Sequence, residues 1–439
     1  MKFGTDGVRG VAHTELTTEF AARLARAASR VLGADGPEVV IGADPRESSP
    51  DFVAALAEGF TSAGLDVIDL GVVPTPAVAF EAQRRGAMGA MVSASHNAYA
   101  DNGIKLFAVG GTKLGDDVQA QIEAELDRDA PATASSDGRG SVVRADDHSA
   151  YVEHVLSILE DRRLDGMRIV LDVANGAAID VGPEVLQGTG AEVVVIANEP
   201  DRRNINDDCG ATHPTAVAAA VLEHRADVGI ALDGDADRLI AVGHLGNVVD
   251  GDHVIAICAE DLRDRGLLAD DTVVITVMTN LGFRLAMEEA GIGVVETAVG
   301  DRYVLEALAD GGYSLGGEQS GHVIFSDHAT TGDGLLTAVA LLDVVKRADR
   351  PLADIATDAM TSLPQVLVNV RVAAKVPDVA ERMATEIAAV EADLGDTGRV
   401  LVRASGTEPL VRVMVEAPTA ETARHAADTL AAAARARFV

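Results

Sequence analysis

Short apolar runs and amphipathic stretches alternate along most of the chain in three successive rounds. The first round has apolar runs at 38–42, 64–68 and 86–92. An amphipathic stretch over 51–63 separates the first two runs, and a second helix-length stretch precedes the third. Short β-branched runs that alternate with amphipathic stretches are typical of βαβ units and a mostly parallel sheet.

Two further rounds repeat this layout, each with an "AG" or "GA" turn before its middle strand. Their expected strands lie at 168–172, 190–195, 226–232, 272–276, 291–295 and 311–315. Self-similarity on this scale predicts three related α/β domains. The remainder differs from them, with expected elements at 366–372 (strand), 377–394 (helix), 399–415 (strand pair) and an Ala-rich stretch at the end (helix).

We therefore expect an α/β fold of three tandem related domains with mixed, mostly parallel sheets, plus a smaller C-terminal α+β domain. A chain of 439 residues has room for several domains. The expected boundaries are 1–147, 148–248, 249–360 and 361–439.

A polar loop follows the third expected strand of each round, over 93–97, 233–238 and 316–322. Ligands of α/β proteins bind at the carboxyl ends of parallel strands. Three different polar loops at equivalent places predict one shared central cleft.

The second of these loops is acidic. Asp233, Asp235 and Asp237, here called the acidic triad, alternate along an extended segment, so their side chains can share one side. Carboxylates held together repel unless a cation sits among them, and hard oxygen ligands with room for water or phosphate suit Mg²⁺. Arg238 follows directly and could contact a phosphate.

The first loop, Ser-Ala-Ser-His-Asn, offers Ser95 as a phosphoryl acceptor. Such a serine needs cations against the developing charge and a positioned proton acceptor. His96 and Lys105 are close enough in sequence to serve, and Lys105 is one of only five lysines in the chain. Taken alone, a loop of this kind is more typical of a turn without catalytic function. The acidic triad in the equivalent loop of the next round favours a phosphoryl acceptor instead.

The two remaining polar segments suit a sugar phosphate. Glu318, Ser320 and His322 alternate and offer an acceptor, a donor and a titratable group to neighbouring hydroxyls. In the last domain, a turn with two arginines, two hydroxyls and a glycine forms a plausible phosphate nest, made of Arg403, Ser405, Gly406, Thr407 and Arg412.

Composition narrows the class of partner. The net charge of −33 argues against a nucleic-acid-binding surface. No apolar run is long enough to span a membrane, the start MKFGTDGVRG lacks a signal-peptide core, and two cysteines make no disulfide framework. We expect a cytoplasmic protein, a monomer or a homodimer, with no nucleic-acid or membrane partner. The acidic, lysine-poor composition fits a high-salt cytoplasm or a high-GC genome equally.

Taken together, these motifs resemble the α-D-phosphohexomutase superfamily, in its order and over essentially the whole chain. The resemblance implies four domains around a central cleft, which carry in turn a phosphoserine loop, a Mg²⁺ loop, a sugar loop and a phosphate loop. It implies that Ser95 is the phosphoserine and that its phosphate binds Mg²⁺ together with the acidic triad. Arg9, Lys105 and Arg238 would surround the transferred phosphoryl group, with Lys105 or His322 assisting proton transfer.

The same resemblance implies a substrate-binding set, which comprises Gly300, Asp301, Glu318, Ser320, Arg403, Ser405, Gly406, Thr407 and Arg412. The runs that resemble the bacterial subgroup acting on glucosamine phosphate lie at 3–10, 299–304, 317–322 and 330–334. The implied activity interconverts glucosamine 6-phosphate and glucosamine 1-phosphate through a bound 1,6-bisphosphate, for UDP-N-acetylglucosamine synthesis. Glucosamine or glucose 1,6-bisphosphate would be the activator.

Three other interpretations stay open from the sequence. A phosphomannomutase or phosphoglucomutase would use the same machinery on a sugar with a 2-hydroxyl. A sugar phosphatase would pass the Ser95 phosphoryl group to water. A sugar-phosphate sensor would bind without turnover, although every loop keeps its reactive groups.

Overall fold

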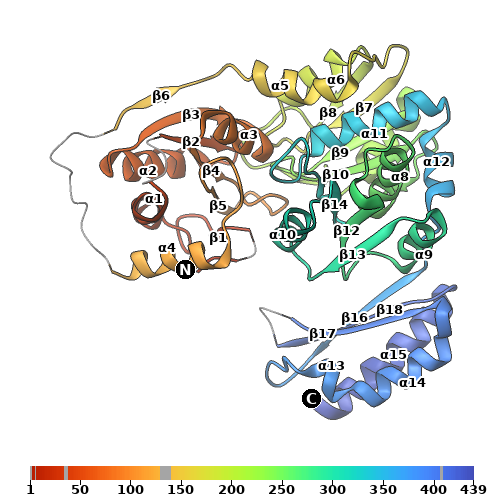
Figure 1. Cartoon of the computed structure of the whole chain (residues 1–439). Coiled ribbons are helices and arrows are strands. Elements are labelled where there is room, and N and C mark those ends of the chain that lie inside the picture. Colours follow the sequence, from red (N-terminus) through yellow and green to blue (C-terminus); the bar gives the residue numbers. More distant parts are fainter. Residues whose placement is uncertain (1, 5, 34–37, 129–139, 406–408) are drawn as a thin grey trace. The chain divides into compact units, whose positions relative to one another are not determined.

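The computed structural model describes residues 2–4, 6–33, 38–128, 140–405 and 409–439. The chain divides into two compact units, unit 1 (Met1–Met278 with Gly291–Ala359) and unit 2 (Thr279–Ala290 with Met360–Val439). Unit 1 holds the sheets built from β1 to β15, and unit 2 holds the sheet β16–β18 (Figure 1).

The first sheet of unit 1 has the strand order β1-β5-β4-β2-β3-β6. Its strands are β1 (Val8–Val11), β2 (Glu38–Ala43), β3 (Asp66–Val72), β4 (Met88–Val92), β5 (Asp101–Phe107) and β6 (Val142–Arg144). Its helices are α1 (Thr18–Leu32), α2 (Ser49–Ser62), α3 (Thr75–Arg85) and α4 (Asp116–Asp127). β2 is parallel to β3 and β4, whereas β5 is antiparallel to β4 and β1. Leu24, Phe52 and Phe60 from α1 and α2 are fully buried in the core.

The second and third sheets have the orders β11-β10-β9-β7-β8 and β13-β12-β14-β15. The strands are β7 (Arg168–Asp172), β8 (Glu192–Ile196), β9 (Val228–Leu232), β10 (Leu239–Gly243), β11 (Val248–Val249), β12 (Thr272–Thr276), β13 (Gly293–Thr297), β14 (Leu315–Gly317) and β15 (Val323–Phe325). The helices of this part of unit 1 are α5 (Ser149–Leu156), α6 (Val181–Gly188), α7 (Thr215–His224), α8 (Gly251–Asp264), α10 (Asp301–Gly311), α11 (Gly334–Ala348) and α12 (Leu352–Ala359).

One layout recurs in the three sheets of unit 1. Each sheet contains three successive parallel strands, and the third of them turns into an antiparallel partner: β4 into β5, β9 into β10 and β14 into β15. In the first sheet β6 adds a further parallel strand beside β3. The three polar loops predicted from the sequence are these turns. The fold class of three α/β domains with mixed sheets and a smaller C-terminal domain is thereby confirmed, while the domain boundaries stay a prediction.

The strand expected at 311–315 was wrong in its start. Gly311 ends α10, and Gly312 follows in the left-handed conformation with φ 65° while its N–H donates to the Leu308 carbonyl. Glycine adopts this conformation without a steric penalty, which makes it a usual helix C-terminus. The strand therefore begins only at Leu315.

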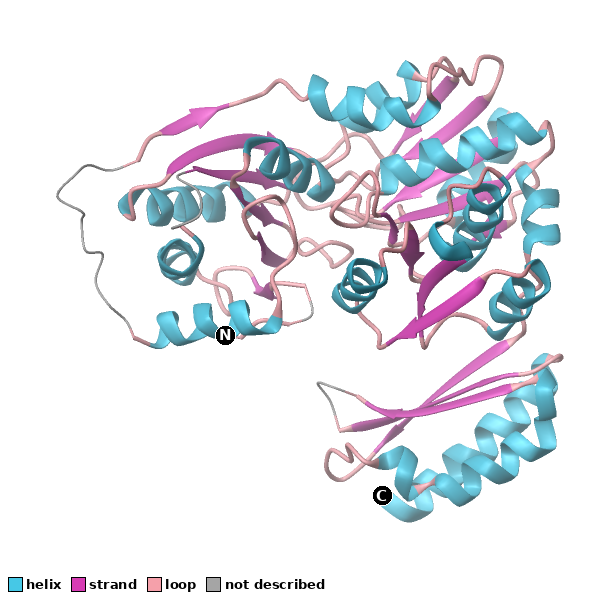
Figure 2. Cartoon of the chain, viewed as in Figure 1, coloured by secondary structure: helices cyan, strands magenta, loops and turns pink. Residues whose placement is uncertain are grey.

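Unit 2 contains an antiparallel sheet in the order β16-β18-β17, with β16 (Gln365–Arg371), β17 (Arg399–Ala404) and β18 (Leu410–Glu416). Its helices are α9 (Leu281–Ala290), α13 (Val379–Arg382), α14 (Ala384–Leu394) and α15 (Ala420–Phe438). Figure 2 shows α14 and α15 on one face of this sheet. The helix expected over 377–394 is interrupted at Met383, whose φ of −106° and ψ of 12° lie outside the helical range. Among the described residues, no helix has the length and apolar character needed to cross a membrane.

Asp333 starts α11 and is itself buried. Its carboxylate accepts hydrogen bonds from the N–H groups of Leu335 (3.0 Å) and Leu336 (2.9 Å) and from the Tyr151 hydroxyl (2.9 Å). Such an N-cap satisfies helix N–H groups that have no partner within the helix. Burial nevertheless raises the pKa of Asp333 to about 6.

We expect Asp333→Asn to make unit 1 more stable than the wild type at pH 7 but not at pH 4. A raised pKa means that the folded protein binds the proton more tightly than the unfolded chain. That stabilisation is complete below about pH 4 and is lost as the pH rises through about 6, by up to roughly 3 kcal/mol. Asparagine is neutral throughout and can still accept the cap hydrogen bonds. Thermal midpoints at both pH values measure the difference; exposed Asp327→Asn is the control, and an equal effect at both pH values would contradict the expectation.

Candidate active site

Ser95 lies in the β4–β5 turn with a strained backbone. Its φ of 52° is left-handed, a conformation that costs a non-glycine residue roughly 1–3 kcal/mol and persists only where the surroundings impose it. Its N–H donates to the Ser93 hydroxyl at 2.9 Å. Arg46 and Asn206 each donate to its carbonyl oxygen at 2.9 Å. Arg46 is 1% exposed and pairs with Asp44 at 2.9 Å, so the turn rests on a buried ion pair.

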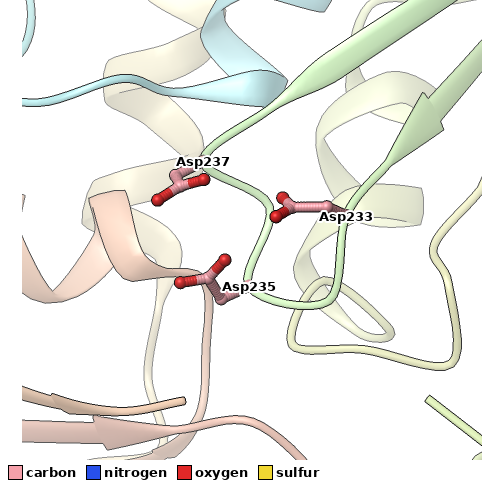
Figure 3. Close-up of side chains that lie close together, drawn as sticks. All are labelled: Asp233, Asp235 and Asp237. Carbon is pink, nitrogen blue, oxygen red and sulfur yellow. The ribbon is translucent and has the colours of Figure 1, made fainter. Parts of the chain in front are cut away.

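The acidic triad occupies the β9–β10 turn beside Ser95. Ligand oxygens of Asp233, Asp235 and Asp237 lie within 4.8 Å of one another, and all three side chains are buried (Figure 3). The Ser95 hydroxyl donates to Asp233 Oδ2 at 2.5 Å. Gly234 permits this approach, since a Cβ there would lie 2.5 Å from the Ser95 carbonyl oxygen. The two turns predicted to meet therefore do meet.

The electrostatics of the acidic triad favour a cation. Burial, Asp237 and Asp235 together hold the pKa of Asp233 well above its ordinary value. The Oδ1 atoms of Asp235 and Asp237 are buried without a hydrogen-bond partner. Three clustered carboxylates with unpartnered oxygens match the oxygen donor set of Mg²⁺. The triad therefore fits a hard divalent metal ion.

Lys105 on β5 supplies positive charge at the same place. Its ammonium lies 2.8 Å from Asp235 Oδ2, 2.7 Å from Asp237 Oδ2 and 2.7 Å from Asp6 Oδ2. Although its burial opposes the effect, these carboxylates raise the pKa of Lys105 well above its ordinary value. Although burial of Asp237 likewise opposes it, Lys105 lowers the pKa of that carboxyl to about 2. Lys105 is therefore a charged ammonium in this arrangement.

A cavity of about 480 Å³ opens beside these groups. Its lining includes Arg9, His96, Asp237, Arg238, Gly300, Asp301, Glu318 and His322. Arg238 Nη1 lies 3.2 Å from His96 Nδ1, and the Ser95 hydroxyl lies 3.4 Å from the same nitrogen. Burial and the charge of Arg238 lower the pKa of His96 to about 4, so this ring is neutral near pH 7.

The third loop borders the same cavity. Glu318 Oε1 accepts the Gly300 N–H at 3.0 Å, and the exposed Ser320 hydroxyl donates to Glu318 Oε2 at 3.4 Å. His322 is 2% exposed, neither of its ring nitrogens has a hydrogen-bond partner, and Nε2 lies 3.6 Å from Asp301 Oδ2. Carboxylate, hydroxyl and imidazole groups of this kind suit sugar hydroxyls.

The remaining predicted residues belong to unit 2. Arg403 on β17 stands opposite Arg412 on β18 in the strand register. Burial and the charge of Arg412 lower the pKa of Arg403, and Arg412 Nε is buried without a hydrogen-bond partner. Like charges directly opposite each other are unfavourable unless an anion joins them. Gly406 and Thr407 lie outside the described residues, and Ser405 donates its N–H to the Leu410 carbonyl at 2.8 Å.

Several residues of this site were missed in the sequence. Asp6 binds both Lys105 and Arg9, and Thr75 donates to Asp235 Oδ2 at 2.5 Å. Arg46 and Asn206 hold the Ser95 turn. No local pattern marks these residues, because their partners lie far away in sequence. Lys113 was also missed, and the scarcity of lysine could have drawn attention to it.

Models of one protein family cover most of the chain. They are those of phosphoglucomutase/phosphomannomutase, with alpha/beta/alpha domain I matching residues 1–133, domain II 149–246, domain III 250–363 and the C-terminal domain 367–433.

Individual proteins are similar over nearly the full length. The phosphoglucosamine mutase of Thermobifida fusca is 53% identical over 439 residues, covering 98% of this chain and 97% of that protein. A phosphoglucomutase/phosphomannomutase family protein from Burkholderia thailandensis is 27% identical with a TM-score of 0.82, covering 98% of this chain and 97% of that one. Aspergillus fumigatus N-acetylphosphoglucosamine mutase, whose structure is a complex with GlcNAc-6P and magnesium, shares the fold at 18% identity and a TM-score of 0.69, covering 100% and 96%.

We expect Asp235→Asn to weaken binding of a divalent cation by at least about tenfold, because it removes one of three charged oxygen ligands. Isothermal titration with Mg²⁺ and Mn²⁺ measures the affinity. Asp264→Asn is the matched control, since Asp264 is an exposed carboxyl elsewhere in unit 1. Equal affinity of the Asp235 variant and the wild type would show that the triad is not a metal site.

Proposed function

This chain belongs to the phosphoglucomutase/phosphomannomutase family of the phosphohexomutase superfamily, and from that premise we propose that it is a phosphoglucosamine mutase, an isomerase that interconverts glucosamine 6-phosphate and glucosamine 1-phosphate. The observation that carries the proposal is the Ser95 hydroxyl, 2.5 Å from Asp233 of the acidic triad. The 53% identity to a phosphoglucosamine mutase supports the substrate.

Ser95 is proposed to carry the phosphoryl group as a phosphoserine. The bond between Ser95 Oγ and phosphorus breaks as the 1- or 6-hydroxyl oxygen of the sugar monophosphate bonds to phosphorus, and the hydroxyl proton passes to a base. The product of this step is a 1,6-bisphosphate. After the bisphosphate turns over in the site, its other phosphate returns to Ser95. Glucosamine or glucose 1,6-bisphosphate would phosphorylate a resting Ser95 in the same way.

A metal ion and three cationic side chains are proposed to hold the transferred phosphoryl group. The acidic triad and the Ser95 phosphate would bind Mg²⁺, which supplies positive charge against the phosphoryl oxygens when bound. Arg9 and Arg238 line the cavity next to Ser95, and arginine suits phosphate because its planar group donates two parallel hydrogen bonds. Lys105 adds a third cation, whose ammonium contacts Asp235 and Asp237 of the triad.

His322 and Lys105 are the candidates for the proton acceptor. Three carboxylates keep Lys105 protonated in the arrangement described here, which suits it to stabilise charge. His322 has two ring nitrogens without a hydrogen-bond partner and lines the cavity. A neutral imidazole nitrogen can accept a hydroxyl proton, so His322 fits this role better. His96, whose Nδ1 faces Arg238, is proposed to orient that guanidinium.

Substrate-binding roles are proposed for residues of each unit taken by itself. Glu318, Ser320 and the Gly300–Asp301 segment would bind the sugar hydroxyls and the 2-amino group. Arg403 and Arg412, with Ser405, Gly406 and Thr407, would bind the phosphate that is not transferred. An anion between the two paired arginines would relieve their mutual repulsion.

The enzyme is proposed to work in the cytoplasm as a monomer or a homodimer. Cys209 and Cys258, the only cysteines of the chain, are buried and unpaired. Thiols that persist without disulfides are typical of a reducing compartment.

The substrate assignment is tested by offering glucosamine, glucose and mannose 6-phosphates with Mg²⁺ and a trace of hexose 1,6-bisphosphate, at low and at high salt. We expect the enzyme to isomerise a sugar phosphate in this assay and to prefer glucosamine 6-phosphate clearly over the other two. A preference for glucose or mannose phosphate would make the chain a phosphoglucomutase or phosphomannomutase. Release of free phosphate without isomer formation would indicate a phosphatase.

We expect Ser95→Ala to abolish turnover while the fold remains intact, because the proposed carrier of the phosphoryl group is then missing from both half-reactions. Coupled product formation and mass-spectrometric phosphate content measure the effect. Ser157→Ala removes an exposed hydroxyl far along the chain and should leave both unchanged. Substantial residual turnover in the Ser95 variant would contradict the role of the serine.

A further inference from the structure

A second buried lysine lies next to Lys105 and has no part in the mechanism so far. The Lys113 ammonium lies 2.8 Å from Asp6 Oδ1 and in direct contact with Asp301 Oδ2. Its side chain is 9% exposed. Although burial opposes the effect, Asp301 and Asp6 raise the pKa of Lys113 above its ordinary value. Lys113 is thus a permanent positive charge between two carboxylates.

Asp6 connects this lysine to the phosphoryl-transfer groups. Its Oδ1 accepts from Lys113, while its Oδ2 accepts from Lys105 at 2.7 Å and from Arg9 at 3.0 Å. Lys105 in turn contacts the acidic triad. A continuous series of ion pairs therefore leads from Asp301 through Lys113, Asp6 and Lys105 to the triad. Within this series, Lys113 joins Asp301 to Asp6.

Asp301 connects the lysine to the sugar-binding side. It is the first residue of α10, follows Gly300 directly, and approaches His322 at 3.6 Å. The Gly300 N–H in turn donates to Glu318. A shift of Asp301 would therefore disturb the positions of both His322, the proposed proton acceptor, and Glu318, the proposed sugar ligand.

The segment around Lys113 makes two further contacts to the same part of the chain. The Gly111 carbonyl accepts from the Thr330 hydroxyl at 2.6 Å. Asp116, the first residue of α4, forms an ion pair with the largely buried Arg302 of α10; both helices are labelled in Figure 1. Of the three residues that make these contacts, Lys113 is the one that also binds Asp6, the partner of Lys105 and Arg9.

We propose that Lys113 is a positioning residue, whose ammonium holds Asp6 and Asp301 together and so keeps the phosphoryl-transfer groups in register with the sugar-binding loop. The inference rests on the proposed mutase function, which it deepens. Loss of the ammonium leaves the carboxylates of partly buried Asp6 and buried Asp301 without the cation between them, and one of them must move or take up a proton. Lys105, Arg9 and His322 then lose their fixed partners, although none of them is itself changed.

The test compares Lys113→Met and Lys113→Arg with Lys346→Met, which changes an exposed lysine of α11. Misplacement of reacting groups by about 1 Å can cost on the order of 100-fold in rate. We expect Lys113→Met to lower kcat by roughly 30- to 100-fold with less than about a threefold change in KM, because substrate ligands remain. Lys113→Arg should have a higher kcat than Lys113→Met, since a guanidinium can span both carboxylates. We expect the decrease in log kcat relative to the wild type to be smaller by at least about a third. Lys346→Met should match the wild type.

A double variant keeps the test decisive if Lys113→Met folds poorly. Lys113→Met combined with Asp301→Asn removes the ammonium together with one of its two carboxylate partners, so two charged carboxylates no longer face each other. This variant should fold as the wild type does and still show the low kcat. Wild-type kcat in either variant, or no recovery with arginine in a folded protein, overturns the inference while the mutase function stands. An unsubstituted enzyme that turns over none of the three sugar phosphates overturns both.

Discussion

Mutual repulsion among three buried carboxylates is the constraint on which the active region of unit 1 depends. Asp233, Asp235 and Asp237 are all nearly inaccessible to water and lie within 4.8 Å of one another. Charges buried together in this way are tolerated only where opposite charge compensates them. Lys105 provides part of that compensation, and unpartnered oxygens remain for a metal ion. Stability is thereby exchanged for a cluster of carboxylates that fits a cation.

The same requirement explains why strands of different sheets must deliver their turns to one place. The Ser95 turn follows β4, the triad follows β9 and Lys105 stands on β5, the antiparallel partner of β4. An antiparallel return strand brings Lys105, ten positions after Ser95, back opposite Met91 of β4, whereas a helical crossover would carry it away. Buried Arg46 holds the Ser95 turn, the Thr75 hydroxyl holds Asp235 of the triad turn, and the Ser95 hydroxyl joins the two turns through Asp233. The repeated hairpin is thus the structural device that concentrates charge.

Much of this fold was predictable from the sequence, and the limit is physical. The alternation of apolar runs identified the parallel strands, and the polar residues after the third strand of each round identified the three loops, because both signals are local. The antiparallel strand β15 and the end of α10 at Gly312 were not predicted, since a three-residue strand and a Gly–Gly pair show little hydrophobic pattern. The roles of Asp6 and Arg46 were not predicted, because these residues act through partners that are distant in sequence and come close only in the folded chain.

The use of lysine shows how selective this site is. Lysine supplies only five of the 36 basic residues, yet Lys105 and Lys113 are both buried here. An ammonium is a compact charge with three donors and can contact three carboxylates at 2.7–2.8 Å, as Lys105 does. A guanidinium is larger and planar, and its five donors are fixed in a rigid fork, so it is less suited than an ammonium to several carboxylates that converge on one point. Whatever drives arginine to prevail elsewhere, high salt or base composition, the convergent geometry of several carboxylates on one point is a reason for lysine to persist at these two positions.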